Sequence, residues 1–167
     1  LTLAYEEFGE EYDETTIDQK RKITEIHQPD GKNDLLQQVE NGALSIVNSY
    51  IALGRLYRGI ICRDLRQYVH LGDAASMTDG IIGNDDDRWI FTENNPGREM
   101  STATNLAATA RVLRGFNDTL SVHCLNIAET IFASANERTD KTQAAAELYL
   151  ATGKDVYMNY LLDNQEN

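Results

Sequence analysis

The chain has 167 residues, a hydrophobic share of 41% and a formal net charge of −12, from 27 acidic and 15 basic side chains. Its length suits one compact domain, and its hydrophobic share excludes general disorder. The negative charge argues against binding to nucleic acid or to anionic membranes, whose phosphates would repel it. It suits neutral substrates, cationic ligands or metal ions, although solubility alone also explains it.

The first predicted helix covers residues 1–8, where apolar side chains recur at helical spacing, and Gly9 marks its end. Residues 10–32 carry acidic and then mixed charges, and they are predicted to form a loop with a turn at Pro29-Asp30-Gly31. Because the apolar helical face begins at the first residue, we expect the sequence to be a piece of a longer chain.

A second helix is predicted to begin at Asn33-Asp34 and to end at Gly54. Asp34 is followed three residues later by Gln37, which resembles a capping box. The apolar stripe of this helix consists of Leu36, Val39, Ala43, Ile46, Val47, Tyr50 and Ile51.

The stretch from Arg55 to Arg98 has no helical pattern. Short strands are predicted at 57–62 and 66–71, which are rich in β-branched and aromatic residues. The acidic run at 84–87 interrupts any regular element, and 94–97 is a strong turn signal. A connection this long between helices tends to be functional.

The C-terminal part of the sequence reads as helices joined by short turns. Gly115 is expected to end one helix and Asn117-Asp118 to start the next. Another helix runs from about Ala144 to Gly153, and Asp155 can cap a last one. The apolar face of the helix after Asn117 consists of Leu120, Cys124, Ile127, Ala128, Ile131 and Ala135. Paired antiparallel helices predict an all-α bundle, solenoid or ring of hairpins.

Cys62 and Cys124 are too few for a disulfide framework and lack the spacing of a zinc site, so we expect buried thiols. His123 and Cys124 are adjacent on a helix and point about 100° apart, which excludes a dyad between them. No phosphate-binding loop or dinucleotide fingerprint is present in the sequence.

Several stretches of the sequence match the motifs of one enzyme family, in the same order. They are Leu3-Ala4-Tyr5-Glu6, Asn33 to Val39 with Gly42, Leu56 to Ile61 with Gly72-Asp73-Ala74, Thr102 to Leu113 with Phe116-Asn117-Asp118, Cys124 to Glu129, and Ala145 to Gly153. Together they resemble the catalytic domain of family 9 glycoside hydrolases.

This resemblance implies that residues 1–167 form a partial (α/α)6 toroid, built from antiparallel helix hairpins, with an irregular and partly β loop region at about 55–100. It also implies hydrolysis of β-1,4-glucan or a related polysaccharide with inversion, which uses two carboxylates on opposite faces of the sugar. Members of the family are mostly secreted or periplasmic, so the resemblance implies that location.

Both catalytic carboxylates of the family fall outside this sequence. The base lies in an "Asp-Ala-Gly-Asp" motif ahead of the first helix, and the acid is a glutamate near the family's C-terminus. No catalytic residue is therefore assigned here. We expect the isolated segment to be inactive, and to need the rest of its domain or self-association to cover the apolar faces of half a ring.

The resemblance also bears on metal binding. In some members an "Asp-Glu" pair ahead of the helix that matches 145–153 ligates calcium. Thr139 and Asp140 occupy these positions, so one carboxylate is lost and calcium becomes doubtful. Asp140 is the candidate metal ligand, and its alternative role is to cap the following helix. No other cofactor is expected.

Asp87-Arg88-Trp89 loosely matches the family's "Asp-His-x-x-Trp" segment, which contacts sugar. Trp89 can stack on a pyranose face, or it can pack in the core. Arg88 can donate a bidentate hydrogen bond to sugar hydroxyls, or it can pair with Asp85 or Asp86.

Two further residues are weaker candidates for substrate binding, Arg66 and Asp73, which flank a similar loop. The run from Asp85 to Asp87 can hold a cation or can be a solvated loop. A different class of function remains open: a non-catalytic helical module that binds carbohydrate or another protein.

Overall fold

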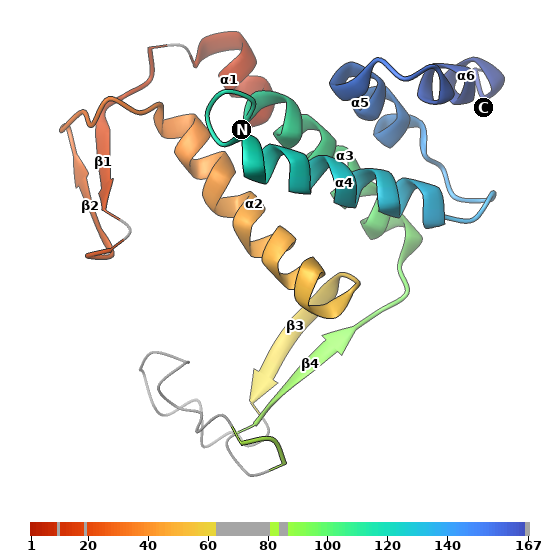
Figure 1. Cartoon of the computed structure of the whole chain (residues 1–167), viewed down its shortest axis with the longest axis horizontal. Helices are drawn as coiled ribbons and strands as arrows, with labels where there is room; N and C mark the ends of the chain where they lie inside the picture. The colour runs from red at the N-terminus through yellow and green to blue at the C-terminus, as the bar shows by residue number, and fades with distance from the viewer. Residues whose placement is uncertain (10, 19, 63–80, 84–86, 166–167) are drawn as a thin grey trace. The chain divides into compact units, whose positions relative to one another are not determined.

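The computed structural model describes residues 1–9, 11–18, 20–62, 81–83 and 87–165 (Figure 1). Within these residues the chain is mostly helical, with six helices and two small antiparallel sheets, which confirms the predicted predominance of helix. The chain divides into two units, 1–48 with 95–167 and 49–94, and each is described by itself.

The predicted helices are present, and glycines close two of them as predicted. The helix bounds are α1 Thr2–Phe8, α2 Asp34–Leu53, α3 Pro96–Val112, α4 Asp118–Ser134, α5 Thr142–Thr152 and α6 Asp155–Asp163. Gly54 and Gly153 directly follow α2 and α5 with φ of 67°, the left-handed conformation that closes a helix. Gly115 lies in the turn after α3, which already ends at Val112 with Leu113 as its C-cap.

The predicted turn at 94–97 is wrong, because α3 already begins at Pro96. The side chain of Asn95 accepts a hydrogen bond from the backbone N–H of Arg98 and so caps the helix. Proline is well suited to the first helical position, where its missing N–H has no partner to lose.

The predicted capping box of α2 is also wrong, by one residue. Asn33 is the residue that caps the helix, since its Oδ1 accepts from the backbone N–H of Leu36 at 3.1 Å. Asp34 instead points to the preceding loop, where its Oδ2 accepts from the backbone N–H of Glu14 at 2.9 Å. The carboxylate therefore fastens the loop to α2 rather than closing the first turn.

The stretch 10–32 was predicted to be a loop, but its described residues include a β-hairpin. They contain the antiparallel pair β1 (Thr15–Asp18) and β2 (Ile23–Ile26). Asp13 holds the base of this hairpin, because its carboxylate accepts from the backbone N–H groups of Asp30 and Gly31 at 3.0 and 2.8 Å.

The unit formed by residues 1–48 and 95–167 is called the helical unit below. Its core forms around α3, which packs against both α4 and α5 (Figure 1). Ala103, Ala107 and Ala110 are fully buried on α3, so backbones can approach closely on more than one side. On α4 five residues of the predicted apolar face are buried, namely Leu120, Cys124, Ile127, Ala128 and Ile131. The sixth, Ala135, follows the helix and is half-buried.

Burial raises the pKa of the Cys124 thiol to about 11, and the predicted buried thiol is confirmed at this position. The side chain of Cys62 lies outside the described residues.

Ile51 departs from the predicted stripe of α2, because 60% of it is exposed.

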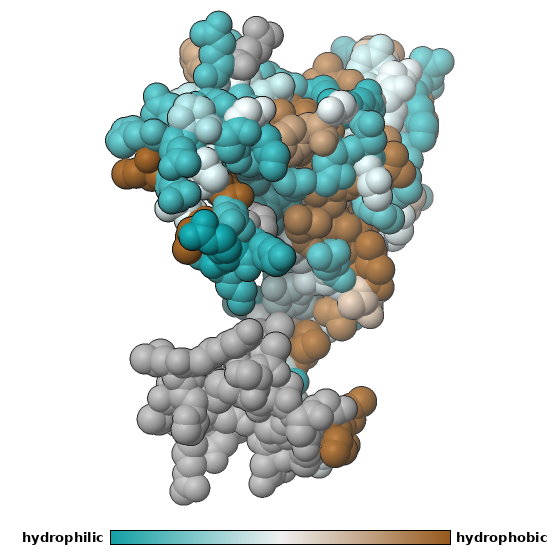
Figure 2. Space-filling view, turned by 60° about the vertical axis from the view of Figure 1, so that its left-hand side comes forward, coloured by the Kyte–Doolittle hydropathy of each residue, from teal (hydrophilic) through white to brown (hydrophobic). Residues whose placement is uncertain are grey.

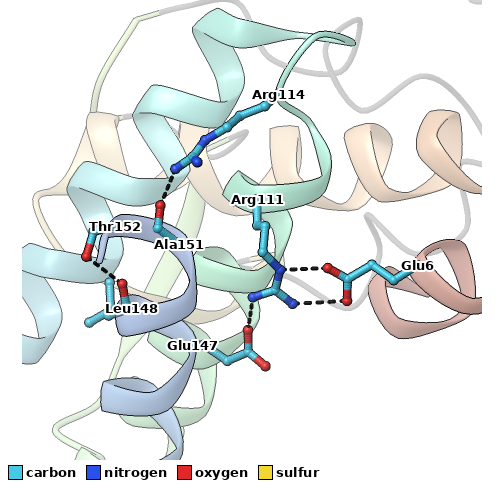
Figure 3. Close-up of polar contacts among 7 residues, drawn as sticks. All are labelled: Glu6, Arg111, Arg114, Glu147, Leu148, Ala151 and Thr152. Carbon is cyan, nitrogen blue, oxygen red and sulfur yellow. Dashed lines mark hydrogen bonds and ion pairs between the residues drawn. The ribbon is translucent and has the colours of Figure 1, made fainter. Parts of the chain in front are cut away.

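One arginine joins three helices (Figure 3). Arg111 of α3 contacts Glu6 of α1 through Nε at 2.6 Å and Nη2 at 3.0 Å, and it donates through Nη1 to Glu147 of α5. Its side chain is 20% exposed. Arg114 donates to the carbonyl of Ala151 at the end of α5.

No helix in the described ranges combines the length and the apolar character needed to cross a membrane.

The contact between Arg111 and Glu6 makes the stability of the fold dependent on pH. The hydrogen bond from Arg111 holds the pKa of the Glu6 carboxyl below its usual value, against a smaller opposing effect of burial. Because the pKa is lower in the folded state, the contact stabilises the fold above the unfolded pKa of Glu6. This stabilisation disappears as the pH falls through the folded pKa.

We expect Glu6→Gln to lower the free energy of unfolding by about 0.5–1 kcal/mol near neutral pH, because a half-exposed pair is worth about this much. The difference from the wild type should vanish at a pH below the folded pKa. Urea unfolding at both pH values measures it. The neighbouring Glu7→Gln is the control, and an equal loss in both variants at neutral pH would contradict the role of Arg111.

Candidate functional site

Three of the residues predicted to bind substrate, Asp87, Arg88 and Trp89, lie at the start of one strand. β4 (Arg88–Thr92) pairs antiparallel with β3 (Tyr57–Cys62), and Asp87 precedes it. The strand predicted at 57–62 is confirmed, whereas the one predicted at 66–71, together with Arg66 and Asp73, lies outside the described residues.

Alternation along β4 places Trp89 and Phe91 on one face of the hairpin. Trp89 is 58% exposed and Phe91 is 44% exposed, so two aromatic rings on the same face are accessible. Phe91 pairs with Gly59, beside which a side chain would meet nothing within 4 Å. The space across from Phe91 is therefore open, and the face suits a flat ligand.

The exposure of Trp89 argues against packing in a core formed by the described residues. A tryptophan that packs in the core would be largely covered. An exposed indole on a strand instead offers its flat apolar surface to a partner.

Asp87 and Arg88 are tied to the hairpin in different ways. One carboxylate oxygen of Asp87 accepts from the backbone N–H of Gly83 at 2.6 Å. Arg88 is half-buried, and its Nε has no hydrogen-bond partner among the described residues. Its predicted alternative partners, Asp85 and Asp86, are outside the described residues.

A glutamate fastens the other end of the hairpin. Glu93 pairs through its carboxylate with Arg58 at 2.9 Å, and its backbone carbonyl accepts from Arg55 at 3.0 Å. These contacts join residues at and before the start of β3 to the residue that follows β4, next to the register shift after Tyr57. The aromatic face is thus carried on a strand pair that is fastened at this end.

Phe91 is not among the residues predicted to bind substrate, although the sequence around it indicates a strand. The segment Arg88-Trp89-Ile90-Phe91-Thr92 is rich in aromatic and β-branched residues, which is typical of a strand. Assigning it as a strand would have placed Phe91 on the face of Trp89.

Asp140 lies in the helical unit, in the loop between α4 and α5. It borders an open hollow of about 540 Å³ that is also lined by Arg138 and Thr104. Its Oδ1 accepts from the backbone N–H of Thr142 at 2.9 Å, and this bond holds the pKa of the carboxyl below its usual value. The N-cap position of α5 is Lys141, so Asp140 precedes it by one residue and contacts the first residue of the helix instead of capping it.

The described residues do not form a calcium site at Asp140. Within these ranges no group of three or more histidine, cysteine, aspartate or glutamate side chains is placed to hold a metal ion. Calcium takes six to eight oxygen ligands, and one exposed carboxylate bound to a backbone N–H does not approach that number.

Comparison of this chain with known protein families, with curated proteins and with solved structures finds no match.

The exposure of Trp89 can be measured directly, because it is the single tryptophan of the chain. We expect the fluorescence of the folded protein to resemble that of an indole in water, and acrylamide to quench it almost as well as in the unfolded chain. Emission that is blue-shifted and protected from acrylamide would show that the indole is covered instead.

Proposed function

We propose that this chain belongs to the catalytic domain of a glycoside hydrolase similar to family 9. That domain would act on β-1,4-glucan or a related polysaccharide with inversion. The observation that carries the proposal is the exposed pair Trp89 and Phe91 on one face of the β3–β4 hairpin. The apolar C–H faces of pyranose rings suit such aromatic surfaces.

The helix boundaries add support. Phe116 and Asn117 fall in the turn between α3 and α4, Asp118 begins α4, and Thr152-Gly153 falls at the end of α5, which agrees with the resembling motifs. In the proposed domain the six helices are part of an (α/α)6 toroid. Their role is then to support the cleft, because both carboxylates of the reaction belong to other parts of the ring.

Exposed apolar side chains on the helical unit fit a domain with further helices. Figure 2 shows hydrophobic patches among the polar residues of the surface. Large apolar side chains that are more than half exposed include Leu1, Leu3, Phe8, Val122, Leu150, Val156 and Leu162. We infer that further helices of the same domain, or a second copy of the chain, cover them. The proposed location is secreted or periplasmic.

Binding to glucan tests the role of the aromatic face. We expect the chain to be retarded in a native gel that contains soluble β-1,4-glucan, and Trp89→Ala or Phe91→Ala to weaken the retardation several-fold, since each removes a stacking surface. Phe8→Ala is the matched control, because it removes an exposed aromatic ring from α1. Equal retardation of all variants would contradict the site.

A hydrolysis assay tests whether the chain is active by itself. We expect the 167-residue chain to release no reducing sugar from soluble β-1,4-glucan, because inversion requires two positioned carboxylates that this segment lacks. A reducing-sugar assay over days measures this. Clear release by the purified chain would refute the assignment of both carboxylates to the missing parts. Binding without release is also what a non-catalytic carbohydrate-binding module would give, and only addition of the missing parts distinguishes the two.

A further inference from the structure

Three basic side chains occupy the turn between β1 and β2. Lys20, Arg21 and Lys22 are adjacent in the sequence, and no other position of the chain has two neighbouring basic residues. All three are exposed. In a chain with a net charge of −12, this turn is therefore a distinct, positively charged surface feature.

The printed contacts of Arg21 are local and weak. Its backbone N–H donates to Asp18 Oδ1 at 2.8 Å, and its guanidinium lies 3.9 Å from Asp18 Oδ2. The side chain of Arg21 is 66% exposed, and an exposed ion pair contributes little to stability. The guanidinium can therefore exchange Asp18 for the carboxylate in the specificity pocket of a trypsin-like protease.

A protease must bind several residues in an extended conformation, and the tip of this hairpin can open to provide them. β2 is exposed along its whole length, and among the described residues it pairs with β1 alone (Figure 1). A two-stranded hairpin by itself is marginally stable. Lys22 has a φ of 56°, a conformation that residues with a side chain rarely adopt. Local opening of the tip therefore does not require the helices to unfold.

The base of the hairpin is bonded much more extensively than its tip. The carboxylate of Asp13 accepts from the backbone N–H groups of Asp30 and Gly31 at 3.0 and 2.8 Å. The backbone N–H of Glu14 donates to Asp34 Oδ2 at 2.9 Å. Each of these bonds joins a residue before the turn to a residue after it.

The first helix is also held from the other side of the turn. Glu6 of α1 accepts from Arg111 at 2.6 and 3.0 Å, and the side-chain amide of Asn33 donates to the carbonyl of Gly9. A break in the chain within the turn would thus leave α1 and β1 attached to the remainder at several separate points.

We propose that residues 20–22 are a cleavage site for a serine protease specific for paired basic residues, and that the cut chain remains one folded assembly. Water adds across the peptide bond after Arg21 or Lys22, which leaves a carboxylate on that residue and an amino group on the next. The modification is a nick in the fold rather than the removal of its first residues. The proposal is independent of any hydrolytic function of the chain.

Digestion of the folded 167-residue chain with a protease that cleaves after paired basic residues tests the site. We expect mass spectrometry to find one cut, after Arg21 or Lys22. The two pieces should elute together from a size-exclusion column at the volume of the uncut chain, and they should separate in urea.

Variants test the recognition and the opening separately. Arg21→Gln leaves no pair of adjacent basic residues and should abolish the cut. Lys32→Gln is the matched control, because it removes an exposed basic residue that has no basic neighbour. Ile17→Cys with Thr24→Cys places a disulfide between opposite residues of β1 and β2. When this bond is formed the tip cannot open fully, so cleavage should slow about tenfold, and reduction should restore it.

Several results would overturn the proposal. They are resistance of the folded chain at a site that is cut once the chain is unfolded, equal cleavage of the wild type and Arg21→Gln, and separation of the pieces in the absence of urea. An unchanged rate in the oxidised double-cysteine variant would contradict the opening of the hairpin. Circular dichroism reports whether each variant folds, and if the double-cysteine variant does not, Arg21→Gln and Lys32→Gln still decide the question.

Discussion

The helical unit depends on the close approach of helices around α3. Ala103, Ala107 and Ala110 have no exposed surface, and α3 meets α4 on one side and α5 on another. Larger side chains at these positions would force the neighbouring helices apart, since protein interiors have few voids to absorb added volume. The polar contacts of Arg111 with α1 and α5 are possible because this packing brings the three helices within reach of one side chain.

Several of the carboxylates that produce the negative charge form structural hydrogen bonds within the described residues. Asp13 and Asp34 accept backbone N–H groups and fasten the loop before α2, and Glu6 is held by Arg111. Carboxylates used in this way satisfy donors that would otherwise lack partners. Part of the acidic composition therefore has a structural explanation.

The sequence by itself determined the helices, because the signals involved are local. Apolar spacing placed the buried face of α4, and Gly54 and Gly153 ended α2 and α5 through their backbone freedom. Only the tertiary structure decided which polar residues meet. The exposure of Trp89, the contact of Asp34 with Glu14 and the pairing of β3 with β4 depend on segments that are distant in sequence. Local propensity carries no information about such contacts, because their partners lie many residues away.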